Sequence, residues 1–78
     1  MRKIYFVAID GNKKCFIQVS YLMSTEETIK REFEAFRPIK DASPKYVLSL
    51  DTIDMSRDGI VHINVVDFLL DKVDIYLS

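Results

Sequence analysis

The sequence predicts a small α/β domain of the α+β type, built on a mixed β-sheet, and three observations carry this prediction. Residues 15–21 (CFIQVSY) form a short apolar run rich in β-branched and aromatic residues, as in a buried strand. Ser24 to Glu27 then shows the Ser-x-x-Glu pattern of a helix capping box. Another apolar strand, residues 46–50, follows the helix, so the order is strand, crossover helix, strand.

Length and composition limit the class of protein. A chain of 78 residues corresponds to one small domain (1–78) with a barely sufficient core. Hydrophobic content of 49% with 29% charged residues is typical of a globular protein. No apolar run approaches the roughly 20 residues that span a bilayer, and the first residues lack the pattern of a signal peptide. We expect a cytoplasmic protein whose lone Cys15 is a reduced, structural thiol.

An antiparallel hairpin is expected from residues 2–9 and 13–21. Asp10, Gly11 and Asn12 form a strong turn signal between these two strand-like segments. The first segment is apolar on both faces, which is typical of a strand that is central in a sheet or covered on both sides.

The crossover helix is expected at about residues 25–37. Glu26 and Glu27 fall in its first turn, at the positive end of the helix dipole, and Pro38 ends it. The apolar stripe expected to pack on the sheet is Ile29, Phe33 and Phe36.

The second half of the chain predicts two more strands and a short helix. The strands are residues 45–50 and residues 60–64, the latter preceded by the turn residue Gly59. Asn64 is expected to cap a helix over residues 65 to about 71. Its expected inner face is Val66, Leu69 and Leu70. Alternation at residues 73–77 then predicts a spare amphipathic strand with no partner in its own domain.

Motifs for catalysis or cofactor binding are almost absent. Neither a phosphate-binding loop nor a dinucleotide fingerprint occurs, and Cys15 has no second cysteine for a zinc site. The single His62 lies in a strand, where a structural role is expected. Three aspartates form the best metal candidate, but their spacing differs from a calcium loop and favours Asx turns. They are Asp51, Asp54 and Asp58. We therefore expect no metal and no cofactor.

Residues 44–70 (PKYVLSLDTIDMSRDGIVHINVVDFLL) resemble the C-terminal end of a family of bacterial and archaeal AAA-type ATPases. In that family a P-loop ATPase domain precedes a C-terminal domain of uncharacterised role. The segments KIYFVA, FIQVSY and STEETIKREFEAF are similar to the same family in the same order, so the resemblance covers about residues 3–70 and leaves 71–78 as a tail. It implies a restriction-endonuclease-like PD-(D/E)XK fold.

The resemblance also implies where a nuclease site would lie. Active nucleases of this fold use an Asp and a Glu/Gln-x-Lys pair to hold a metal and activate water. The corresponding positions here are Tyr5 for the Asp, and Gln18 and Ser20 for the pair. Tyrosine carries no charge at neutral pH and serine cannot replace an ammonium group. We expect a degenerate site and no enzymatic activity, since the ATPase domain is also absent from these residues.

Two classes of function follow. The first is a non-catalytic accessory domain that docks a partner, a neighbouring ATPase domain or a second copy of itself. The alternative is a nucleic-acid-binding or nuclease domain, which the net charge of −1 disfavours. Its phosphate contacts would come from Lys13, Lys14, Lys30, Arg31 and Arg37. A homodimer is expected, because this fold normally places a helix and a strand before the hairpin; without them residues 2–9 form an apolar sheet edge.

Overall fold

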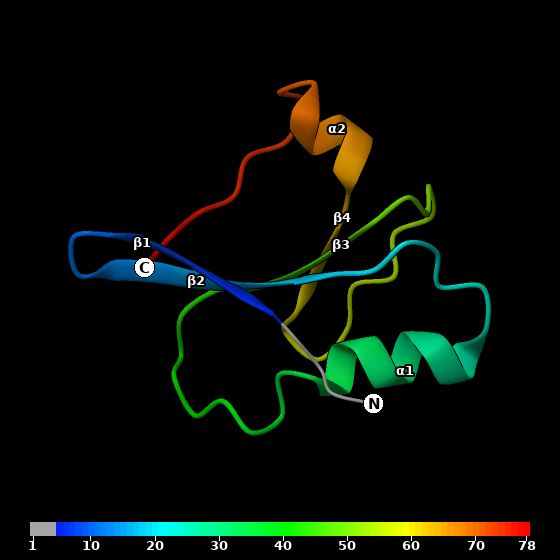
Figure 1. The fold of residues 1–78 in the computed structure, drawn as a ribbon, viewed down its shortest axis with the longest axis horizontal. Coiled ribbons are helices and arrows are strands. Elements are labelled where there is room, and N and C mark those ends of the chain that lie inside the picture. The colour runs from blue at the N-terminus through cyan, green and yellow to red at the C-terminus, as the bar shows by residue number, and fades with distance from the viewer. Residues whose placement is uncertain (1–4) are drawn as a thin grey trace.

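The computed structural model describes residues 5–78 and has the expected α+β class, with a mixed four-stranded sheet and two helices (Figure 1). Along the sheet the strands follow the order of the chain, from β1 to β4. β1 pairs antiparallel with β2, whereas β2 with β3 and β3 with β4 are parallel. The strands are β1 (Phe6–Asp10), β2 (Lys13–Val19), β3 (Lys45–Ser49) and β4 (Val61–Asn64).

The first two strands form the expected hairpin. Gly11 has a φ of +64°, which glycine adopts without strain at the first central position of a two-residue turn. β1 is an edge strand, not a central one, although it is apolar on both faces. The expected start of this strand, at residues 2–4, lies outside the described residues.

Helix α1 (Glu26–Glu34) is the crossover between the parallel strands β2 and β3. Its N-cap is Thr25 and not Ser24, and the third helical position is then Thr28 instead of a glutamate, so the expected Ser-x-x-Glu capping box was wrong. Thr25 has an extended backbone, and its hydroxyl accepts the N–H of Thr28 at 3.1 Å. Residues 35–38 continue as turns, so the regular helix ends three residues earlier than expected.

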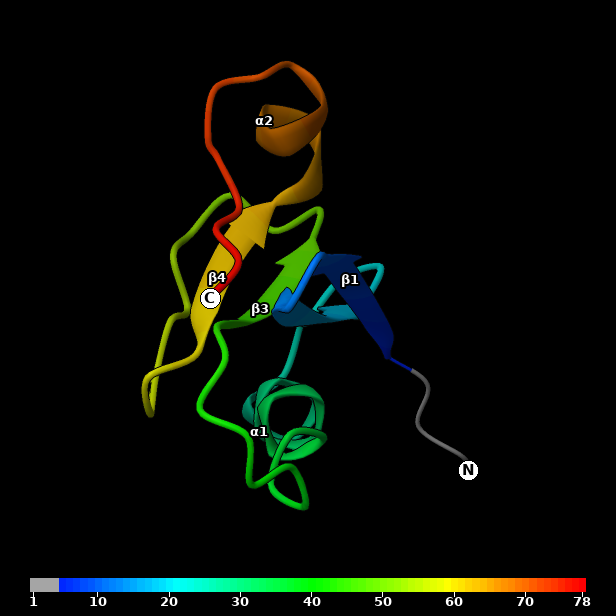
Figure 2. The same ribbon diagram turned by 90° about the vertical axis from the view of Figure 1, so that its left-hand side faces the viewer.

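The core on the α1 face confirms the expected apolar stripe of the helix. Phe33 and Phe36 are buried there, and Ile29 packs at the margin. The sheet contributes Phe16 and Val47, and the segment after β2 contributes Met23. Figure 2 shows α1 on one side of the sheet and α2 on the other.

Helix α2 (Val65–Leu69) is capped by Asn64 as expected, but its expected inner face was wrong. Val65 and Phe68 pack on the second face of the sheet. The side chains of Val66, Leu69 and Leu70 are exposed instead. Because α2 follows β4 without a connecting residue, the direction of the strand fixes the phase of the helix.

The C-terminal segment is not a spare strand, which corrects another expectation. Val73, Ile75 and Leu77 pack on the second face of the sheet, over a core that includes Cys15, Tyr46, Leu48 and Ile63. Its end is also bonded to β2: Ser78 and Lys14 exchange two backbone hydrogen bonds of 3.1 and 3.2 Å. The segment has partners because α2 is too short to cover this face alone.

Replacing Phe33 by alanine tests the packing of α1. Phe33 is buried between the helix and the sheet, so Phe33→Ala should lower the free energy of unfolding by about 3–5 kcal/mol. Glu34→Ala, at the next position, should change it by less than about 0.5 kcal/mol. Urea unfolding measures both, and equal losses would contradict the helical phase described here.

Candidate functional site

Tyr5 and Gln18, two of the three nuclease-like positions, lie on the α1 side of the sheet. The Tyr5 ring contacts the rings of Phe16 and Phe36, each at 6.1 Å between centroids. Gln18 is two residues beyond Phe16 in β2 and therefore shares its face. Ser20 follows the end of β2, and its N–H donates to the carbonyl of Leu48 at 2.8 Å.

Gln18 is bonded to a helix residue that the sequence analysis did not single out. Its Nε2 donates to Oε1 of Glu32 at 2.9 Å, and both residues are buried. Arg31 approaches the other oxygen of Glu32 at 3.8 Å. Its position in the sequence could have indicated this contact. Glu32 lies between Ile29 and Phe33, at the margin of the helix face that packs on the sheet, where a carboxylate needs a buried partner.

This pair lacks the ligands that a nuclease metal needs. It offers one carboxylate and one amide, and the Oε1 of Gln18 has no hydrogen-bond partner among residues 5–78. Within the same range no group of three His, Cys, Asp or Glu side chains is placed to hold a metal ion. The expectation of an inactive nuclease-like site stays a prediction, now with Gln18 fixed by the helix.

A second polar cluster joins Ser49 at the end of β3, Asp51 in the loop that follows, and His62 within the parallel strand β4. Ser49 Oγ is 2.8 Å from Nε2 of His62 and 2.6 Å from Oδ2 of Asp51. The backbone N–H of Met55 donates to Nδ1 of His62 at 3.2 Å. Since Nδ1 accepts this bond, Nε2 carries the ring proton and donates it to Ser49, whose hydroxyl donates to Asp51.

Serine, histidine and aspartate are the residue types of a nucleophilic triad, but the direction of their hydrogen bonds and the burial of Ser49 indicate a different role. A triad needs the histidine to accept the hydroxyl proton, whereas His62 donates to Ser49. Ser49 is also fully buried, so its oxygen cannot meet a substrate. Asp51 accepts in addition the N–H of Met23 at 2.9 Å. The cluster therefore ties the loop after β3 to both strands and to the segment before α1, and His62 has the expected structural role.

The three aspartates proposed as a metal candidate are kept apart by these contacts. Asp51 belongs to the cluster with Ser49. Asp54 accepts both the N–H and the hydroxyl of Ser56, at 2.9 and 2.6 Å, which is an Asx turn. Asp58 occupies a tight turn with Gly59, and both have positive φ values of 54° and 77°. The expected turn role is confirmed for Asp54.

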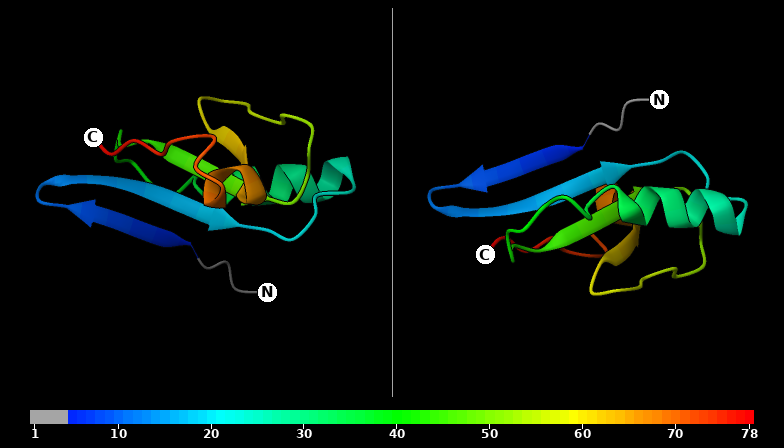
Figure 3. Two further views of the ribbon diagram at one scale, coloured as in Figure 1. Left: turned by 90° about the horizontal axis from the view of Figure 1, so that it is seen from above. Right: turned by 90° about the horizontal axis from the view of Figure 1, so that it is seen from below.

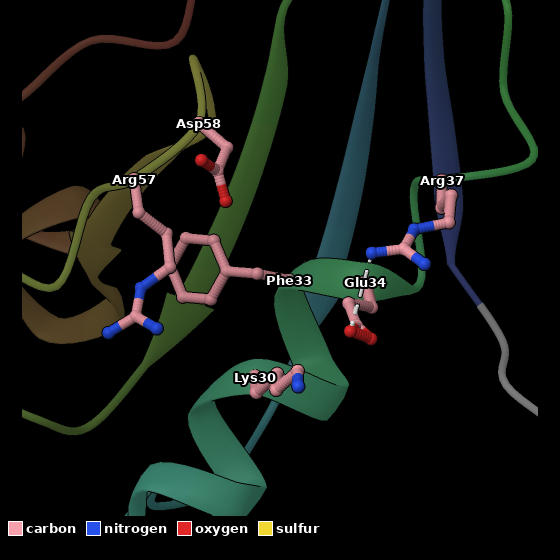
Figure 4. Close-up of a pocket in the computed structure, with 6 residues that line it drawn as sticks. All are labelled: Lys30, Phe33, Glu34, Arg37, Arg57 and Asp58. Carbon is pink, nitrogen blue, oxygen red and sulfur yellow. Dashed lines mark hydrogen bonds and ion pairs between the residues drawn. The ribbon is translucent and has the colours of Figure 1, made fainter.

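A cleft of about 410 Å³ separates α1 from the turn at Arg57 and Asp58 (Figure 4). The guanidinium of Arg57 lies 5.5 Å from the centroid of the Phe33 ring. The Phe33 side chain lines the cleft between α1 and this turn. Arg57 also donates to Glu26 at 2.7 Å, and Arg37 pairs with Glu34 at 3.5 Å. Lys30 and Asp58 also line the cleft, so its three cations are balanced by the carboxylates of Glu26, Glu34 and Asp58 and the cleft carries no basic excess.

Most of the basic residues expected to contact phosphate in the nucleic-acid alternative are also paired with carboxylates. Lys14 pairs with Asp41 at 2.7 Å, and Arg31 and Arg37 each have a neighbouring glutamate. The bond from Lys14 and those from Ser43 hold the pKa of Asp41 well below its usual range. These residues lie on β2 and around α1, and three of the five are already in ion pairs.

The β1 edge of the sheet combines exposed apolar side chains with one side that pairs with no strand of the described chain. Phe6 and Ile9 of β1 are 60% and 68% exposed, and they lie on opposite faces of the strand. In Figure 3, β1 lies at the margin of the molecule with β2 on one side only. The free N–H and C=O groups along the outer side of an edge strand are a template for the addition of another strand.

Comparison with models of protein families, with curated proteins and with solved structures finds no match. The resemblance to an AAA-type ATPase family and to a nuclease-like fold therefore stays a prediction. Neither helix of residues 5–78 has the length and apolar character that a membrane crossing requires.

Acid should destabilise the protein through Asp51. Burial raises the pKa of this carboxyl group, but the hydrogen bonds from Ser49 and Met23, with the nearby His62, lower it by more. A group whose pKa is lower in the folded state stabilises fully above its unfolded value of about 3.8, and this contribution is lost as pH falls through the folded value. The free energy of unfolding should therefore decrease as the pH is lowered below about 4.

The variant Asp51→Asn should lower stability at pH 7 by roughly 1–2 kcal/mol and weaken the acid dependence. Asp74→Asn, at an exposed position, should change stability by less than about 0.5 kcal/mol. Denaturant unfolding between pH 2 and pH 7 measures both effects. An acid dependence of Asp51→Asn identical to that of the natural chain would contradict the role given to this cluster.

The nuclease-like positions predict no DNA cleavage. Plasmid incubated with the protein and magnesium or manganese should stay supercoiled, because the resemblance places Tyr5 and Ser20 where an active nuclease has a metal ligand and a lysine. A gel assay measures this. Metal-dependent cleavage that Gln18→Ala abolishes would show that the site is active.

Proposed function

We propose that this chain is a non-catalytic accessory domain that docks another protein, and that it is the C-terminal part of an AAA-type ATPase with a degenerate nuclease-like fold. The resemblance of residues 44–70 supports the family assignment, and the order of hairpin, crossover helix and parallel strand is compatible with it. The lone Cys15, buried and unpaired, supports a reducing location such as the cytoplasm.

The observation that carries the docking role is the open edge at β1. A β-strand that adds to this edge would gain main-chain hydrogen bonds and would cover Phe6 on one face and Val7 and Ile9 on the other. We propose an extended segment of a protein as the ligand, since a strand has two faces and an edge that match these groups.

Phosphate binding has weaker support. Lys14, Arg31 and Arg37 each have a carboxylate partner within 4 Å, so contacts with phosphate would have to replace existing ion pairs. The excess of acidic over basic residues, with a net charge of −1, acts in the same direction.

A capped peptide with alternating threonine and valine tests the docking role. At millimolar concentration it should shift the amide resonances of Val7 and Ile9 in ¹⁵N-labelled protein, because it adds as a strand beside β1. The amide of His62 at the other edge is the internal control, since it already donates to Ser56 at 2.8 Å. No shift at β1, or a larger one at His62, would contradict the proposal.

A further inference from the structure

The two edges of the sheet differ in whether their outer backbone groups are hydrogen-bonded to other parts of the chain. The outer edge of β4 is partly covered by the preceding loop. Ile60, the residue before β4, exchanges two backbone hydrogen bonds with Arg57, at 2.8 and 3.1 Å, and within β4 the N–H of His62 donates to Ser56 Oγ at 2.8 Å. The tight turn at Asp58 and Gly59 holds this loop against the strand. A strand added at β4 would have to displace these bonds.

The outer edge of β1 has no such cover among residues 5–78. On β2, the backbone N–H groups of Lys14 and Phe16 bond to Ser78 and Pro44, on the side away from β1. Val7 and Ile9 are opposite Phe16 and Lys14, so they are the pairs of this ladder without hydrogen bonds. Their own N–H and C=O groups therefore point outward, and no described residue bonds to them.

We propose that the partner at the β1 edge is a second copy of this chain, paired antiparallel about a two-fold axis at Val7; this inference rests on the docking role of β1 proposed above. A head-to-tail contact of β1 with β4 would have to break the bonds of Arg57 and Ser56, whereas the symmetric contact of β1 with itself breaks none among residues 5–78. In this register Val7 faces its symmetry mate, Ile9 faces Tyr5 and Phe6 faces Ala8.

The side chains of β1 are compatible with this self-pairing. Asp10 is the only charged residue of β1 and lies at its end, so the two copies place no like charges opposite each other near the axis. The pairing would join two four-stranded sheets and continue the apolar surface of each face across the axis. The other edge of the described sheet, at β4, is partly occupied by the chain's own loop.

The exposed area indicates how strong the dimer is. With roughly 200 Å² for a large side chain, the exposed parts of Phe6, Val7 and Ile9 amount to on the order of 300 Å² per protomer. About 600 Å² for the pair is below the standard interface size of about 1,600 Å². We therefore expect a weak dimer that forms between about 10 μM and 1 mM.

Charge reversal at the two-fold axis tests this proposal. Sedimentation equilibrium over that concentration range should show the mass of the natural chain rising from 9.1 kDa toward twice that value. Val7→Lys and Val7→Glu should each stay monomeric, because like charges meet at the axis, and an equal mixture of the two should dimerise. Ile53→Lys, which adds the same charge at an exposed loop position, should behave like the natural chain.

Three results would overturn the proposal. They are a natural chain that stays at 9.1 kDa up to 1 mM, a Val7→Lys variant that dimerises like the natural chain, and a mixture that stays monomeric although circular dichroism shows both variants folded. The peptide experiment distinguishes this failure from that of the docking role. A monomer that still binds the peptide at Val7 and Ile9 would keep the docking role and exclude the second copy.

Discussion

The four-stranded sheet has two apolar faces, but of its two helices only α1 is longer than five residues. This shortage of helix to cover the sheet determines the path of the rest of the chain. α1 closes one face with Phe33 and Phe36. The other face is closed by α2 together with residues 73–77, although none of these residues is fully buried. Two backbone hydrogen bonds between Ser78 and Lys14 hold the C-terminal segment beside the first part of β2, which extends beyond its pairing with β3. The same limited supply of covering elements leaves β1 open.

Local patterns were sufficient for most of the elements. The hairpin turn at Gly11, the stripe of Phe33 and Phe36 and the cap at Asn64 depend on residues close in the sequence, and the structure confirms them. The inner face of α2 was predicted wrongly because its short apolar run fits two helical phases. Only the tertiary contact of Val65 and Phe68 with the sheet selects one of them.

The candidate site was less accessible to sequence reasoning, because its contacts join distant segments. Gln18 and Glu32 are 14 residues apart, and Ser49 and His62 are 13 apart. Parallel pairing of β3 with β4 brings Ser49 and His62 into contact, and the direction of that pairing could not be predicted from the sequence. The orientation of the His62 ring depends further on the N–H of Met55 in a loop without regular structure. Residue types alone would have suggested a triad that the hydrogen bonds exclude.

The central claim is that β1 is an open edge which another strand can cover. Amide hydrogen exchange of Val7, Ala8 and Ile9 tests it most directly, because Ala8 faces β2 and the other two face outward. At about 10 μM the account predicts slow exchange for Ala8 and fast exchange for Val7 and Ile9, with the latter two becoming slow near 1 mM. Equal exchange rates for all three amides at both concentrations would contradict it.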